Sequence, residues 1–181
     1  MIREDGLSFE TRLFPESEQV VELLGDLPAV RRSLFETGVP AHLFNRYLAD
    51  LGLSILVPQE NVPLVRFGTS GLVQAVGVDV RSGRVLAVLY PELEPTILVN
   101  STIDHFSRTV RALVDRFPYY SRDADWSEID LACAHLSEAV RSIDEVAGAP
   151  GCYWPGFIDD VQMGVFSTED VLAWWHRRES P

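Results

Sequence analysis

Apolar residues recur along this chain with two different spacings, one typical of helices and one typical of strands. These spacings predict where helices and strands lie. Between residues 16 and 36, apolar side chains recur at helical spacing, but Gly25 and Pro28 interrupt the run. We therefore expect two short helices that lie across a sheet. Gly38 and Pro40 end this region, because glycine permits a left-handed turn and proline forces its predecessor into extended geometry.

Short runs of apolar and β-branched residues fill the middle of the chain. They predict strands over residues 41–47, 53–57, 64–67, 72–80, 84–90 and 96–99. Residues 68–71 predict a turn, and Gly83 is expected at positive φ in a hairpin that joins 72–80 to 84–90. Strands connected by such short turns pair antiparallel.

Two longer amphipathic helices are predicted after the strands. The first is expected to begin with Ser101 as its cap and Asp104 in its first turn. Its apolar stripe is Ile103, Phe106, Val110, Leu113 and Val114. The second begins at Ser127, with Asp130 in its first turn, and stops before Gly148. Its apolar face is Ile129, Ala132, Cys133, Leu136, Val140 and Ile143.

The elements together predict one α+β domain over residues 1–181, with a core over about 16–166 and a helical tail over 167–181. Residues 167–170 are expected to cap a final short helix through Trp174 and Trp175. Helices gather at the ends and strands follow one another in the middle. This order favours a largely antiparallel sheet over alternating strand and helix units.

The balance of charges limits the classes of partner. The formal net charge is −12, from 27 acidic and 15 basic residues, which argues against direct binding of nucleic acid or of an anionic membrane. A negative field of this size either keeps the protein soluble or steers a basic protein partner into contact. Every basic residue is Arg, so mechanisms that need a lysine, such as a P-loop or a Schiff base, are excluded.

Metal, cofactor and targeting signals are weak or missing in the sequence. Cys133 and Cys152 lack CxxC spacing, and the four histidines are scattered singly, so we expect neither a zinc site nor a cofactor. The first residues do not read as a secretory signal, and no apolar run reaches about 18 residues. These observations favour a cytoplasmic protein.

Paired acids are the remaining candidates for function, and they are Glu92, Glu94, Asp123, Asp125, Asp159 and Asp160. They fit solvated loop acids, an acidic rim that faces a partner, or the carboxylates of a metal-dependent hydrolase. A tryptophan exposed beside such acids would be a natural anchor for an interface.

Several short motifs, taken in order, resemble the SUKH superfamily of immunity proteins, closest to its fourth subfamily. The motifs are Gly38-Val39-Pro40, Arg66-Phe67-Gly68, Val78-Asp79 with Gly83 and Val85, Val99-Asn100-Ser101-Thr102 with Phe106, and Trp154, Ile158-Asp159-Asp160, Gly164 and Phe166. The resemblance covers roughly residues 35–166. It implies a SUKH-like α+β fold with a central curved sheet flanked by helices.

The same resemblance implies a function without catalytic residues. The chain would bind a cognate polymorphic toxin, typically a bacterial nuclease or nucleic-acid deaminase, and mask its active site. The acidic surface would then meet a basic cleft of the toxin. Two alternatives stay open: a regulatory or scaffold protein of the same fold, and a metal-dependent hydrolase.

Overall fold

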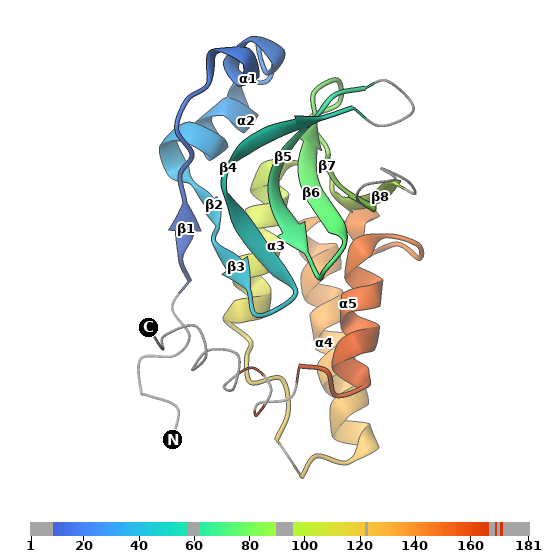
Figure 1. Ribbon diagram of the computed structural model, residues 1–181. Helices are drawn as coiled ribbons and strands as arrows, with labels where there is room; N and C mark the ends of the chain where they lie inside the picture. The colour runs from blue at the N-terminus through green and yellow to red at the C-terminus, as the bar shows by residue number, and fades with distance from the viewer. Residues whose placement is uncertain are drawn as a thin grey trace, which may run out of the picture.

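A curled six-stranded antiparallel sheet organises the computed structural model (Figure 1). The structure describes residues 9–57, 62–89, 96–121, 123–166, 169 and 171. Within these ranges the strands of this sheet lie side by side in chain order, each antiparallel to its neighbours. They are β3 (His42–Leu43), β4 (Tyr47–Leu56), β5 (Leu64–Ser70), β6 (Gln74–Asp79), β7 (Val85–Leu89) and β8 (Thr96–Asn100). The predicted antiparallel α+β arrangement is confirmed.

The N-terminal region forms the two short helices that the interrupted apolar pattern predicts. They are α1 (Glu18–Leu23) and α2 (Pro28–Arg32), and a π-helical turn, Ser33–Thr37, continues α2. Pro28 occupies the first helical position, where its missing N–H has no intrahelical partner to lose. A small ladder of β1 (Thr11–Arg12) and β2 (Val39–Pro40) lies beside this region.

Three longer helices lie behind the sheet in the view of Figure 1: α3 (Ile103–Val114), α4 (Trp126–Ile143) and α5 (Tyr153–Gln162). The short 3₁₀ helix Val146–Gly148 joins α4 to α5. The predicted apolar stripe of α3 is buried at all five positions. The sequence patterns did not single out α5 as a helix, yet it packs along α4 and contacts β8.

An aromatic cluster joins the sheet to the helices. The Phe106 ring of α3 lies 5.1 Å from Tyr47, 5.5 Å from Phe67 and 6.4 Å from Trp154, measured between ring centroids. Trp154 is fully buried. Because truncating such a buried ring costs about 3–5 kcal/mol, this cluster fixes how α3 and α5 sit on the sheet.

Several predicted strand boundaries are wrong. The turn predicted over 68–71 is mostly strand, because β5 runs through Ser70 and only Gly71 turns, with φ of 56°. Gly68 pairs with Ala49 and Val76 in the sheet, and it must be glycine because the Tyr47 ring fills the space where a Cβ would lie. The separate strands predicted over 41–47 and 53–57 are instead β3 and a long β4, whose pairing with β5 shifts between Ala49 and Ser54.

The predicted starts of both helices are also wrong by one or two residues. Thr102, and not Ser101, caps α3 by accepting the backbone N–H of His105. Asp125, and not Ser127, caps α4. The predicted positive φ of Gly83 is confirmed at 72°. The helix expected after residue 167 lies almost entirely outside the described residues.

Candidate protein-binding surface

The start of α4 is fixed by a reciprocal cap that holds an acid in place. Asp125 Oδ1 accepts the Ser127 hydroxyl at 2.6 Å and the backbone N–H of Glu128 at 3.0 Å, while the Glu128 carboxylate accepts the N–H of Asp125. The hydroxyl of Ser127, followed by the N–H of Glu128, lowers the pKa of Asp125. Asp125 is therefore a fixed negative charge on the surface.

Exposed apolar side chains accompany this charge. Trp126, the first residue of α4, is 69% exposed, and Met163, just after α5, is 78% exposed. Gln162 donates to Asp130 at 2.7 Å, which joins the end of α5 to the second turn of α4. Trp126 and Asp130 are four residues apart, so they share one face of the helix. The bridge therefore brings Trp126 and Met163 to the same end of the helix pair.

Asp159 lies along the same seam between α4 and α5. The buried Cys133 thiol of α4 has a raised pKa, first because of burial and then because of the nearby charges of Asp130 and Asp159. Asp159 is exposed, and among the described residues it has no ion-pair partner. Asp159 also lines a hollow with Ser137 and Arg141, farther along α4 than Asp130. We call the surface that runs from the start of α4 along this seam the acidic end, and it comprises Asp123, Asp125, Trp126, Asp130, Asp159 and Met163.

Asp160 has a different environment from its neighbour. Its carboxylate lies 2.7 Å from Arg46 Nη1, and Arg46 Nε also donates to the Tyr153 hydroxyl at 3.1 Å. That hydroxyl shares a 2.7 Å hydrogen bond with Ser70 at the end of β5. Asp160 thus ties α5 to the sheet. Its ion pair with Arg46 separates Asp160 from the other candidate acids, and Glu92 and Glu94 lie outside the described residues.

Asn100 and Ser101 belong to a buried polar network. Asp144, at the end of α4, accepts the backbone N–H of Ser101 at 2.6 Å, the Ser101 hydroxyl at 2.8 Å and the Asn100 amide at 3.1 Å. Asn100 in turn accepts the Trp154 indole N–H at 3.0 Å. Burial alone would raise the pKa of Asp144, but the hydrogen bonds from Ser101 and Asn100 outweigh it, so the pKa is lowered. This network joins β8, α4 and α5.

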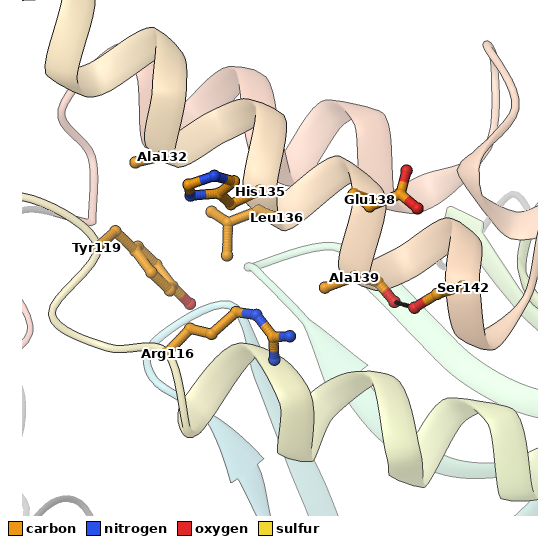
Figure 2. A pocket seen from close by; sticks show the side chains of 8 residues that line it. All are labelled: Arg116, Tyr119, Ala132, His135, Leu136, Glu138, Ala139 and Ser142. Carbon is orange, nitrogen blue, oxygen red and sulfur yellow. Dashed lines mark hydrogen bonds between the residues drawn. The ribbon is translucent and has the colours of Figure 1, made fainter.

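Sequence reasoning missed a groove on the other flank of α4. Its first hollow has a volume of about 390 Å³ and lies between α4 and the chain that leaves α3 (Figure 2). It is lined by Arg116, Tyr119, Ala132, His135, Leu136, Glu138, Ala139 and Ser142. The available signal was the pair Ala132 and Ala139, seven residues apart: small side chains on one flank of a helix leave room beside it.

Other kinds of site have little support in the part of the chain that the structure describes. No group of three or more His, Cys, Asp or Glu side chains there could hold a metal ion. Within the same residues, no helix combines the length and apolar character needed to cross a bilayer.

Comparison with protein families gives one result. The model of the SUKH-4 immunity protein family matches residues 10–160, which is most of the chain. Searches of curated proteins and of solved structures found no match. The antiparallel sheet flanked by helices agrees with the fold expected from the resemblance. The chain belongs to the SUKH-4 immunity protein family.

Proposed function

We propose that this protein neutralises a cognate polymorphic toxin by binding it through the acidic end and covering its active site. Membership of an immunity protein family supports the role. The observation that carries the choice of surface is Trp126, a large aromatic residue left 69% exposed among fixed carboxylates. Burying such a side chain in a partner's pocket is a common way for one residue to dominate an interface.

Charge determines the kind of toxin that this surface fits. Nucleases and nucleic-acid deaminases present basic clefts to their substrates. Asp123, Asp125 and Asp159 would face such a cleft and compete with the nucleic acid. The chain's net charge of −12 would also raise the rate of encounter with a basic partner.

The experiment compares Trp126→Ala with Leu72→Ala against a candidate toxin domain taken from the neighbouring genes, in a catalytically inactive form. Leu72 is 99% exposed in the turn between β5 and β6, so it controls for loss of any exposed apolar side chain. Trp126→Ala should weaken binding about 10- to 100-fold and reduce protection in cells, as expected for a central anchor. Leu72→Ala should bind as the unchanged protein does.

Two results would count against the proposal. If the unchanged protein neither binds the toxin domain nor protects cells that express its active form, the immunity role is wrong for this toxin. If binding is normal and Trp126→Ala has no effect, the toxin contacts another surface. Thermal unfolding of both variants should match the unchanged protein, because both side chains are exposed.

A further inference from the structure

The groove beside α4 is longer than a single pocket. A second hollow of about 290 Å³ shares Tyr119, Ala132 and His135 with the first and extends toward the start of α4. From Glu128 to Ser142, the lining residues of α4 recur every three or four positions and span about 20 Å of helix. A groove of this length suits a segment of a protein better than a small molecule.

Hydrogen-bond donors collect at one end of the groove. Arg116 Nη1 donates to the carbonyl of Ala112 at 2.8 Å, and no other described residue accepts from its remaining N–H groups. The Tyr119 hydroxyl is covered and has no hydrogen-bond partner among the described residues. Figure 2 shows this hydroxyl on the side of the ring that faces Arg116. Burial raises the pKa of Tyr119 well above its ordinary value, so the hydroxyl keeps its proton at neutral pH.

The acids of the groove do not neutralise this end. The Glu138 carboxylate points away from Arg116 in Figure 2. Among the described residues, the bond that Arg116 makes is to the Ala112 carbonyl and not to Glu138. The Glu128 carboxylate is engaged in the cap of α4. An unpaired buried hydroxyl and an incompletely paired guanidinium both favour an acceptor, and a carboxylate is the strongest one that a protein offers.

We propose that the groove receives an acidic side chain from the toxin, which the Arg116 guanidinium and the Tyr119 hydroxyl bind as Arg116 shifts to admit it. This inference rests on the proposed function, because it assigns a second contact to the same partner. The exposed Leu131, which lines the second hollow, offers an apolar contact to the residues that flank this acid. The groove and the acidic end lie on the two flanks of α4, so one partner can reach both.

The two contacts have different consequences for recognition. The acidic end attracts any basic surface, whereas the groove demands a carboxylate at one position of that surface. A non-cognate toxin with a basic residue at this position would place its charge against Arg116 and be rejected. The groove would therefore determine which toxin is neutralised, because specificity often depends on such unfavourable pairs.

The test reverses one charge in the groove and one outside it. Arg116→Glu should raise the dissociation rate of the complex with the toxin domain about 10- to 100-fold, the effect of replacing a charge-assisted hydrogen bond by repulsion. Arg108→Glu is the matched control, because Arg108 is exposed on α3, where it lies 3.8 Å from Asp104. It carries the same change of net charge and should leave the dissociation rate nearly unchanged.

Tyr119→Phe separates recognition from folding. The ring packs against Phe44, Phe117 and Phe157, and phenylalanine keeps those contacts. Because the hydroxyl has no partner in the free protein, its removal should leave thermal stability equal or higher. The complex should nevertheless dissociate about 3- to 10-fold faster, the effect of one lost hydrogen bond. A purely structural role for Tyr119 would not give this combination.

A rescue screen identifies the acid on the toxin. Each Asp and Glu of the toxin domain is changed to Arg, and binding to Arg116→Glu is measured. One position should restore binding to Arg116→Glu and not to Arg108→Glu. If the unchanged protein binds the toxin and Arg116→Glu binds equally well, the groove inference is wrong while the proposed function stands. If no form of the protein binds, the proposed function fails first.

Discussion

At the scale of single residues, Asp144 shows how one buried carboxylate connects distant parts of the chain. It is 5% exposed and accepts three hydrogen bonds from Asn100 and Ser101, more than 40 residues earlier. The sequence singled out Asn100 and Ser101 but assigned Ser101 to the helix cap. The pattern could not reveal their partner, because a long-range hydrogen bond leaves no local periodicity.

Asp144→Asn should lower the free energy of unfolding at pH 7 by about 2–3 kcal/mol, because an amide cannot accept all the donors that surround the carboxylate. The folded-state pKa of Asp144 lies below its ordinary value of 3.8. The carboxylate therefore stabilises the fold above that value, and this contribution is lost as pH falls through the folded-state pKa. Denaturant unfolding at pH 7 and near pH 3 checks this.

The pH dependence of the same variant provides the control for this prediction. The difference in unfolding free energy between Asp144→Asn and the unchanged protein should be large at pH 7 and should shrink in acid. A difference that stayed constant across this range would mean that the charge of Asp144 does not contribute, and that the variant acts through packing alone.

At the scale of elements, the sheet depends on glycines that the apolar pattern treats as ordinary strand positions. A Cβ on Gly77 of β6 would lie 2.7 Å from the Val65 carbonyl oxygen of β5. Backbone on the neighbouring strand cannot move aside without breaking the ladder. In contrast, no atom lies within 4 Å of the corresponding position on Gly52 of β4. A side chain would therefore clash at Gly77 of β6 but fit at Gly52 of β4.

Gly77→Ala should destabilise the protein by about 1–3 kcal/mol, as overpacking of a closely fitted site does. Gly52→Ala, the matched control, should be neutral or slightly stabilising, by up to about 1 kcal/mol, because alanine restricts the unfolded chain. Chemical denaturation of both variants measures this directly. Equal effects at the two positions would show that strand propensity, and not the close approach of Val65, governs the sheet.

Elements also show why part of the binding surface escaped prediction. The helix α5 contains Pro155 and Gly156, which helical patterns disfavour, so its sequence did not stand out. Without α5 beside α4, Asp159 and Met163 could not be assigned to the surface that begins at Trp126 and follows the seam between the two helices. The apolar stripe of α3 was predicted correctly because its burial follows from spacing alone.

At the scale of the whole molecule, the order of strands and helices could be predicted from the sequence. The positions of the candidate binding surfaces could not. Antiparallel pairing follows from short turns between consecutive strands, so local patterns were sufficient for it. Packing between distant elements determines three features that sequence patterns do not reveal. They are the exposure of Trp126, the ion pair between Asp160 and Arg46, and the groove beside α4. Sequence patterns nominated Asp159 and Asp160 as equivalents, and the structure separates them.

The most direct test of the acidic end as the contact surface compares the toxin affinity of Asp159→Asn with that of Asp160→Asn. The two neighbouring substitutions change the net charge of the protein equally, so a difference between them reports on position. If the acidic end is the contact surface, Asp159→Asn should weaken affinity for the toxin domain about tenfold at low salt. Asp160→Asn should change it less than about twofold, since a partly exposed ion pair within the fold contributes little to binding. Equal losses for both variants, or a loss only for Asp160→Asn, would contradict the proposal that the toxin docks on the acidic end.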